Sequence, residues 1–96
     1  MKVAVVGCGY VGLVTGACFS ELGHDVSCID NNEEKIRMLQ AGGVPIYEEG
    51  LEAILHGNVK AGRLRFSTNT AEYVRPAEVV FIAVNTPRMA SGNADL

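Results

Sequence analysis

The residues best suited to chemistry lie in the first thirty positions of the chain. Three glycines, Gly7, Gly9 and Gly12, form a G-x-G-x-x-G pattern, and Asp30 follows eighteen positions after the last of them. A glycine turn that opens a helix presents free backbone N–H groups and a positive dipole end to a phosphate. A carboxylate placed like Asp30 can accept hydrogen bonds from both hydroxyls of an adenosine ribose and repels a 2′-phosphate. The pattern predicts a dinucleotide site that prefers NAD to NADP.

Each glycine of the pattern has a separate physical role. Gly7 permits the tight turn that leaves the strand, and Gly9 lets a pyrophosphate approach the main chain because it has no Cβ. Gly12 lets the helix pack near the first strand, and the first helical turn, which begins at Tyr10, directs its N–H groups at the phosphates. The alternative is a doubly wound domain whose glycine turn only packs tightly, and the surrounding elements favour the ligand site.

The elements around the turn follow the order strand, turn, helix, strand and acid. Residues 3–6 are an apolar, β-branched run typical of a strand buried on both faces. A helical pattern runs from about 10 to 22, and a second strand at 26–29 ends on Asp30. The helix is apolar around most of its girth, so we expect it to be covered on both sides in a whole enzyme. This is the arrangement of a dinucleotide-binding βαβ unit.

The rest of the chain predicts an α/β fold. Its elements are a helix capped by Asn31 or Asn32, a short helix ended by Gly57 and Asn58, a strand at 63–67, a brief helix through Val74 and a buried strand at 79–84. Right-handed crossovers give strand order 3-2-1-4, a doubly wound, Rossmann-like parallel sheet. It is incomplete, since the full fold has about six strands. Thr86 follows the fourth strand, at the edge of the cofactor crevice.

Lys35 lies five positions after Asp30, in the first turn of the second helix. A cation at this place could reach the ribose or the pyrophosphate of a bound dinucleotide. A solvated surface lysine is the other interpretation, and the residues alone leave both open.

Composition excludes several classes of protein. The chain has 96 residues, enough for one domain, and a net charge of −3 with no basic stripe, which argues against nucleic-acid binding. No apolar run approaches the roughly 18 residues of a membrane span, and the N-terminus has no secretory h-region. We therefore expect a cytoplasmic protein with neither a nucleic acid nor a membrane as partner.

The three cysteines, Cys8, Cys18 and Cys28, contain no C-x-x-C pair. We interpret them as small buried hydrophobic residues. Zinc ligands at suitable spacing are missing, so we predict no metal site. A helix N-terminus could activate Cys8, but no partner base lies nearby, and we assign no catalytic residue to this chain.

The chain resembles the UDP-glucose / GDP-mannose dehydrogenase family over essentially its whole length. The segments that carry the resemblance are GCGYVGLVTG (7–16), ELGHDV (21–26), Asp30 with Lys35, PIYEEGL (45–51), GRLRF (62–66), VNTP (84–87) and GNADL (92–96). The resemblance implies that Val11, Asp30, Lys35 and Thr86 contact NAD, and that the segment 47–51 lies near the cofactor. The family usually has a proline where this chain has Glu49.

The resemblance also implies an activity for the enzyme to which such a chain belongs. Family members oxidise a nucleotide sugar to the carboxylate with two NAD, and UDP-glucose is the substrate we expect, in a homo-oligomer when full length. GDP-mannose and UDP-N-acetylmannosamine-type sugars are alternatives within the family. The family's nucleophilic cysteine and catalytic lysine match no residue here, so we expect the N-terminal part of a longer enzyme. A non-catalytic NAD-binding module and a methyltransferase-like domain are the alternatives outside it.

Overall fold

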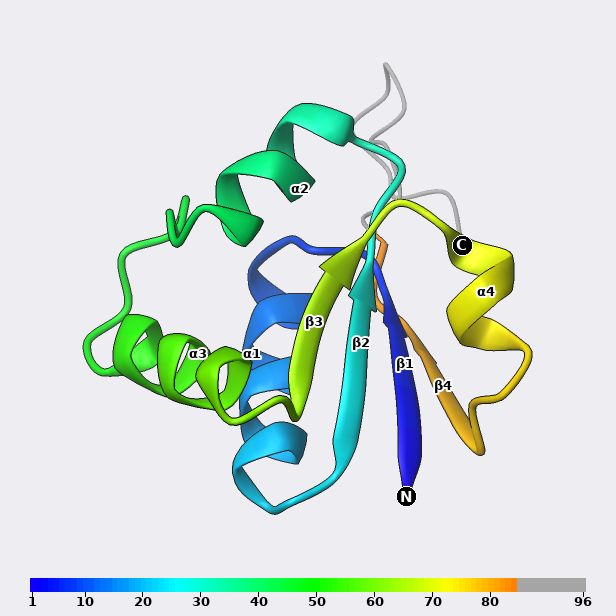
Figure 1. Cartoon of the computed structure of the whole chain (residues 1–96). Helices are drawn as coiled ribbons and strands as arrows, with labels where there is room; N and C mark the ends of the chain where they lie inside the picture. Colours follow the sequence, from blue (N-terminus) through cyan, green and yellow to red (C-terminus); the bar gives the residue numbers. More distant parts are fainter. Residues whose placement is uncertain (85–96) are drawn as a thin grey trace, which may run out of the picture.

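Apolar and β-branched segments form a four-stranded parallel sheet (Figure 1). The structure is a computed structural model that describes residues 1–84. Its strands are β1 (Lys2–Val6), β2 (Asp25–Ile29), β3 (Leu64–Ser67) and β4 (Val79–Ile82), in the order β3-β2-β1-β4. Every neighbouring pair is parallel, so all four strands end at one edge of the sheet. The predicted fold class and strand order are confirmed.

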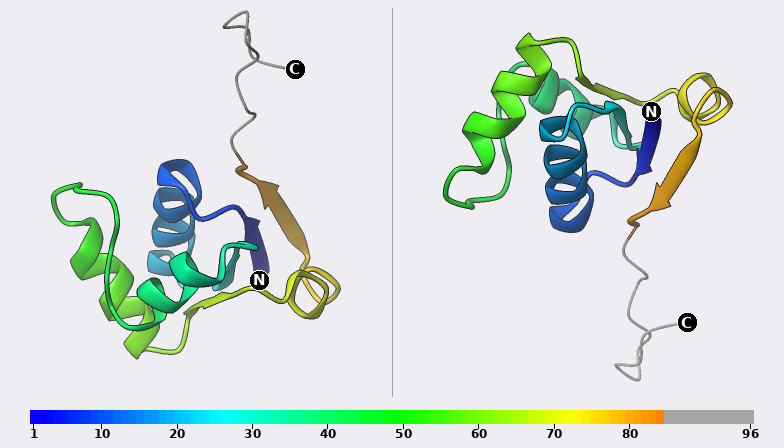
Figure 2. Two further views of the ribbon diagram at one scale, coloured as in Figure 1. Left: turned by 90° about the horizontal axis from the view of Figure 1, so that it is seen from above. Right: turned by 90° about the horizontal axis from the view of Figure 1, so that it is seen from below.

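The helices lie on both sides of this sheet. They are α1 (Tyr10–Glu21), α2 (Glu33–Gln40), α3 (Leu51–Lys60) and α4 (Thr70–Val74). Figure 2 shows α1, α2 and α3 on one side and α4 on the other. The reason is that the chain moves from β1 through β2 to β3 in one direction and then returns to β4, and right-handed crossovers place the returning helix on the opposite face.

The core lies between the sheet and α1, which packs through its small residues. A Cβ added to Gly16 would lie 2.5 Å from the Cys28 sulfur, so only glycine permits this approach. The buried positions of α1 are Gly12, Leu13, Gly16, Ala17 and Ser20. Val11 and Leu22 of α1 are 59% and 73% exposed, because the sheet and α3 cover only part of the helix surface within residues 1–84.

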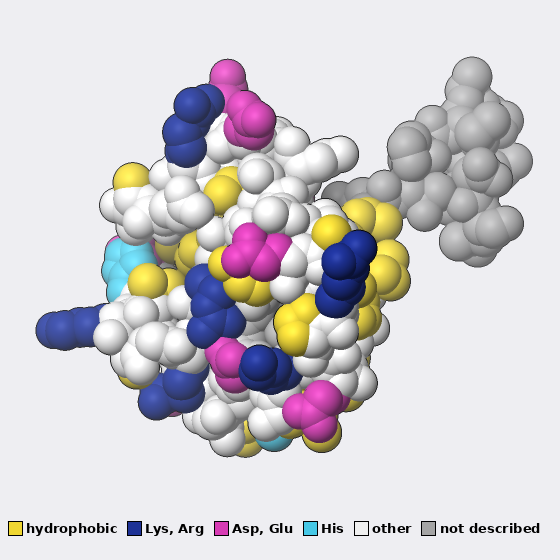
Figure 3. All heavy atoms as spheres, turned by 45° about the vertical axis from the view of Figure 1, so that its right-hand side comes forward, with side chains coloured by type: hydrophobic (Ala, Val, Ile, Leu, Met, Phe, Trp, Pro, Cys, Tyr) yellow, Lys and Arg dark blue, Asp and Glu magenta, His cyan; other side chains and the backbone are white. Residues whose placement is uncertain are grey.

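The fourth strand is less buried than the sequence predicts. It is an edge strand among the described residues, and Val80 and Ile82 are 39% and 69% exposed. α4 lies over β1 and β2 and leaves this part of the sheet uncovered. Figure 3 shows hydrophobic side chains gathered on the side of the molecule that carries β4, while charged side chains are scattered over the rest of this face.

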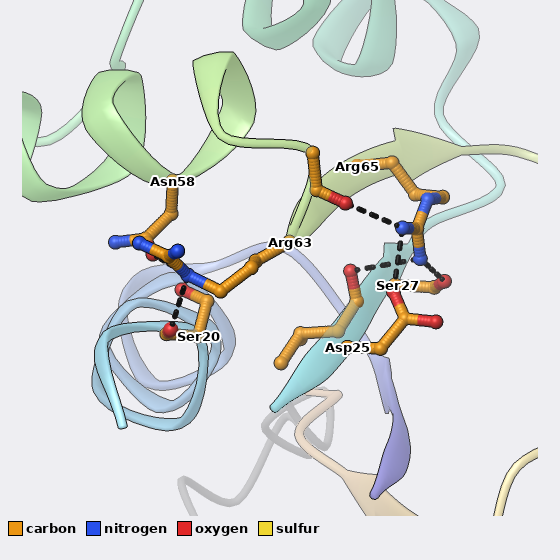
Figure 4. Close-up of polar contacts among 8 residues, drawn as sticks. Ser20, Asp25, Ser27, Asn58, Arg63 and Arg65 are labelled. Atoms are coloured by element: carbon orange, nitrogen blue, oxygen red, sulfur yellow. Dashed lines mark hydrogen bonds and ion pairs between the residues drawn. The ribbon is translucent and has the colours of Figure 1, made fainter. Parts of the chain in front are cut away.

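Two polar clusters fix β3 to its neighbours (Figure 4). Arg63 donates from Nε to the Ser20 carbonyl oxygen at 3.1 Å and to Asn58 Oδ1 at 2.8 Å. Arg65 pairs with Asp25 Oδ1 at 2.5 Å and donates to Ser27 Oγ at 2.9 Å. These contacts tie the start of β3 to α1, α3 and β2.

The first of these clusters explains two errors of the sequence analysis. Asn58 was expected to end α3, yet the helix continues to Lys60. Asn58 is buried, and its Nδ2 donates to Glu21 Oε1 and to the Ile54 carbonyl oxygen, so a polar residue persists inside the helix because its hydrogen bonds are satisfied. Arg63 belongs to the turn that follows, because its N–H donates to the Asn58 carbonyl oxygen, and β3 begins one residue later.

Candidate dinucleotide site

The glycine turn between β1 and α1 is closely packed. Gly7 has φ +114°, a conformation that favours glycine, and its N–H donates to the Ile29 carbonyl oxygen at 2.6 Å. A Cβ on Gly7 would lie 2.7 Å from the Ala83 carbonyl oxygen, and one on Gly12 would overlap the Gly7 carbonyl oxygen. The predicted roles of Gly7 in the turn and of Gly12 in close packing of the helix are confirmed.

The first turn of α1 offers its backbone N–H groups to solvent. Gly9 is the N-cap, at φ −80° and ψ −164°, and no side chain caps the helix. The first turn contains no acidic residue, and Tyr10 and Val11 are 49% and 59% exposed. The N–H groups of a first helical turn have no acceptor within the helix, so this end can bind an anion.

The carboxylate of Asp30 lies against this turn. Its Oδ2 accepts the N–H of Cys8 at 2.9 Å, and its Oδ1 accepts the N–H of Asn32 at 3.0 Å. The side chain is 17% exposed, so it is largely enclosed while one side still reaches solvent. A carboxylate oxygen can accept more than one hydrogen bond, so both oxygens retain capacity for the hydroxyls of a ligand.

Lys35 lies beside the same carboxylate. Its Nζ is 4.0 Å from Asp30 Oδ2, and its side chain is 31% exposed. The Lys35 N–H donates to Asn32 Oδ1 at 3.0 Å, which makes Asn32 rather than Asn31 the N-cap of α2. Lys35 therefore belongs to the polar group around Asp30 and is not an isolated surface lysine.

These residues surround a hollow of about 220 Å³ at the carboxyl edge of the sheet. Gly7, Gly9, Asp30 and Lys35 line it, together with Cys8, Ala83 and Val84, which the sequence analysis did not select. Tyr10, Val11 and Gly12 belong to the adjoining turn of α1. Thr86 lies outside the described residues. Cys8 contributes a backbone N–H, and residue type carries no signal for such a contact.

Cys8 lines this hollow and is buried. Burial, followed by the Asp30 charge, raises the pKa of Cys8 to about 12, so the thiol stays protonated at neutral pH. Burial also raises the pKa of Cys28. Cys18 is exposed, contrary to the interpretation of all three as buried residues, because it lies on the uncovered face of α1. Within residues 1–84, no three metal-ligating side chains come together.

The connection between α2 and α3 reaches the first turn of α1. The Tyr10 hydroxyl donates to Glu48 Oε1 at 3.2 Å, across 38 positions of sequence. The neighbouring Tyr47 is 93% exposed. Glu48 thus joins this segment to the first turn of α1.

Comparison with known proteins decides the family. A family model described as the NAD-binding domain of the UDP-glucose/GDP-mannose dehydrogenase family matches residues 1–96. The chain belongs to this family. NAD is accordingly the cofactor of this domain. The glycine turn and the acid described above belong to the segments that carry the resemblance.

Individual relatives support the same assignment. The chain is 51% identical to UDP-glucose 6-dehydrogenase of Pseudomonas aeruginosa and 50% identical to that of Rhizobium meliloti, over 100% of its own length in both cases. A crystal structure of a ternary complex of GDP-mannose dehydrogenase from Pseudomonas aeruginosa matches 99% of the chain with a TM-score of 0.92 and 39% identity. The chain spans 21% and 22% of the two relatives and 22% of the solved chain.

None of the helices in the described part of the chain has the length and apolar character needed to cross a bilayer.

Proposed function

We propose that the hollow at the carboxyl edge of the sheet holds the adenosine and diphosphate of NAD, in a nucleotide-sugar dehydrogenase that oxidises UDP-glucose to UDP-glucuronate. The observation that carries the site is the contact between Asp30 Oδ2 and the Cys8 N–H, at 2.9 Å. This contact joins a sugar-binding carboxylate to a phosphate-binding turn. A dinucleotide carries a ribose next to a diphosphate, so it presents one group to each of them.

The residues around the hollow fit the two halves of this ligand. Gly7, Gly9 and Gly12 shape the turn, and the N–H groups of Tyr10 and Val11 offer hydrogen bonds to the diphosphate. Asp30 accepts the two ribose hydroxyls, and Lys35 supplies a cation at the border between ribose and phosphate. Thr86 is proposed as a further contact, on the basis of the family resemblance alone.

The bound cofactor would supply hydride acceptance at its nicotinamide ring. The residues of this chain bind and orient it. The open end of α1 places the dipole against the diphosphate, and Asp30 fixes the adenosine end, so that the rest of the cofactor is directed along the edge of the sheet. Gly12 lets this end of α1 pack closely against Gly7 and Ala83, the residues that follow β1 and β4.

UDP-glucose is proposed as the substrate because the two relatives named above, about half identical to this chain, are both UDP-glucose 6-dehydrogenases. The likeness to a GDP-mannose dehydrogenase keeps GDP-mannose as the second candidate. A UDP-N-acetylmannosamine-type sugar and a non-catalytic NAD-binding role remain lesser alternatives. The two oxidations to the carboxylate would consume two NAD for each sugar.

The test of the binding site is the substitution Asp30→Ala, measured by calorimetric titration with NAD. We expect affinity to fall by about 1–3 kcal/mol, the scale of losing charge-assisted hydrogen bonds. Asp25→Ala is the matched control, because Asp25 is a carboxylate at the opposite end of β2, where it pairs with Arg65. Unchanged NAD affinity in folded Asp30→Ala would contradict the proposal.

A second titration separates the dehydrogenase domain from a methyltransferase-like domain. Both classes use a glycine turn and a ribose-binding acid, so the ligand itself must distinguish them. We expect NAD to bind more tightly than S-adenosylmethionine. The reverse order would reject the proposed function.

A further inference from the structure

We propose that Asn32 is a positioning residue that sets the geometry of the Asp30–Lys35 pair and thereby the preference for NAD over NADP. The inference rests on the proposed function of the hollow. Asn32 does not line the hollow and is not among the residues that the family resemblance assigns to NAD.

The contacts of Asn32 form a closed ring with these two residues. Its backbone N–H donates to Asp30 Oδ1 at 3.0 Å. Its side-chain Oδ1 accepts the N–H of Lys35 at 3.0 Å. The ring closes where Lys35 Nζ lies 4.0 Å from Asp30 Oδ2. A single residue therefore contacts both the proposed ribose-binding acid and the cation beside it.

The side chain of Asn32 fixes the direction of its own N–H group. The residue is extended, at φ −83° and ψ 102°, and the bond from Lys35 holds it at the start of α2. Without the side-chain oxygen, this turn gains freedom and the N–H group no longer points steadily at Asp30. The Asp30 carboxylate would then keep one fixed donor, the Cys8 N–H.

The consequence for cofactor choice follows from charge. A fixed Asp30 attracts ribose hydroxyls and repels the 2′-phosphate of NADP. When Asp30 moves, it loses part of both effects, and Lys35 becomes available to a phosphate. Loss of the ring therefore weakens NAD binding and relieves the repulsion of NADP. The ratio of NAD affinity to NADP affinity decreases as a result. A general loss of stability lowers both affinities together and leaves their ratio unchanged.

The chain contains a matched control for this substitution. Asn69 caps α4 in the same way, with Oδ1 accepting the Glu72 N–H at 3.1 Å and backbone angles of φ −90° and ψ 88°. Among the hydrogen bonds of the described residues, none joins Asn69 to Asp30 or Lys35. Substitution of Asn69 removes an equivalent cap without touching the ring.

The experiment compares Asn32→Ala, Asn32→Ser and Asn69→Ala by calorimetric titration with NAD and with NADP. For Asn32→Ala we expect NAD affinity about fivefold lower, the fold-change that matches the loss of one helix cap, with a smaller change for NADP. Asn32→Ser keeps a capping oxygen and should restore the ratio of affinities. Asn69→Ala should lower the melting temperature comparably and leave the ratio unchanged.

Outcomes that overturn the inference differ from those that overturn the proposed function. An unchanged ratio in folded Asn32→Ala, or an equal shift in Asn69→Ala, rejects the role of Asn32 while NAD binding stands. Failure of the unaltered chain to bind NAD rejects both. If Asn32→Ala does not fold, Asn32→Gly gives the same test, because glycine is tolerated at an N-cap but has no side-chain oxygen.

Discussion

The first turns of α1 and α2 lie at the same edge of the sheet and are built in opposite ways. α1 begins at Gly9 with no capping side chain and no acid in its first turn. α2 begins at Asn32, whose side chain accepts a backbone N–H, and continues with Glu33 and Glu34. One helix leaves its N–H groups and positive dipole end open, while the other satisfies both from its own sequence.

Under the proposed function, this difference assigns the two parts of the ligand to different helices. An anion is attracted to the open end of α1, whereas the two glutamates at the start of α2 repel one. The neutral but polar part of a dinucleotide, its ribose, suits the side of α2, where Asp30 accepts hydroxyl groups. Under the proposed function, the contrast between these two helix ends sets the orientation of the cofactor.

The largest expected effect comes from adding a side chain at Gly12, where α1 packs against the backbone of the glycine turn. The Cβ of Gly12→Ala would overlap the Gly7 carbonyl oxygen, and this backbone atom cannot move away easily. We expect the free energy of unfolding to fall by about 3 kcal/mol or more, measured by urea denaturation. Lys35→Ala changes the third residue of α2, the position equivalent to Gly12, and should cost far less.

The same substitution at Gly57 separates the effect of close packing from the effect of helix propensity. Gly57 lies inside α3 with nothing within 4 Å of an added Cβ. Gly57→Ala should raise stability by about 0.5–1 kcal/mol, because alanine favours helix. Loss of stability in Gly57→Ala, or none in Gly12→Ala, would show that close packing does not define the start of α1.

The next effect comes from giving α1 the kind of cap that α2 has. Gly9→Asp places a capping carboxylate at an N-cap whose negative φ any residue can adopt. Stability of the chain without ligand should rise by about 1 kcal/mol. NAD affinity should fall at least about tenfold, or 1.4 kcal/mol, because the carboxylate occupies the place of the diphosphate. Parallel changes in stability and affinity would contradict the assignment of α1 to the phosphates.

A smaller effect is expected from the cation of α2. Lys35→Gln removes a charge 4.0 Å from Asp30 Oδ2 on a side chain that is 31% exposed. We expect NAD affinity to fall by about 0.5 kcal/mol at low salt, and the difference to vanish at high salt because an exposed pair is screened. Lys60→Gln, at the far end of α3, is the control. A loss independent of salt would contradict the proposal that Lys35 acts on the cofactor through its charge.

The sequence was sufficient for the glycine turn and the acid, because each depends on local residue type. It was also sufficient for the strand order, because right-handed crossovers restrict how successive strands can be arranged. Gly7 needs a positive φ, and Asp30 follows a buried strand, so spacing alone places them together. The sequence narrowed the N-cap of α2 to Asn31 or Asn32, and only the contact with Lys35 identified Asn32.

The remaining features depend on contacts between distant residues. The burial of Asn58 inside α3 rests on Glu21 and Arg63, which no local pattern connects to it. The exposed face of α1 could not be predicted either, because an apolar helix does not reveal how many neighbours cover it. Cys8 reaches Asp30 through its main chain, where side-chain type carries no information.

The smallest effect tests whether the segment before α3 belongs with the open end of α1. The hydrogen bond to Glu48, followed by the Glu48 charge, raises the pKa of Tyr10 above its usual value of about 10. Because the folded-state pKa is the higher one, the contact stabilises the chain below the ordinary tyrosine pKa and is lost as pH rises through the raised value. Glu48→Gln keeps an acceptor oxygen but removes the charge, so the Tyr10 pKa should fall toward its usual value, as followed by ultraviolet titration. Glu49→Gln is the control, since in the structure Glu48 accepts the phenol hydrogen bond. An equal shift in both variants would mean that the tyrosine senses the general negative charge of this segment, and α1 would then be joined to it by proximity alone.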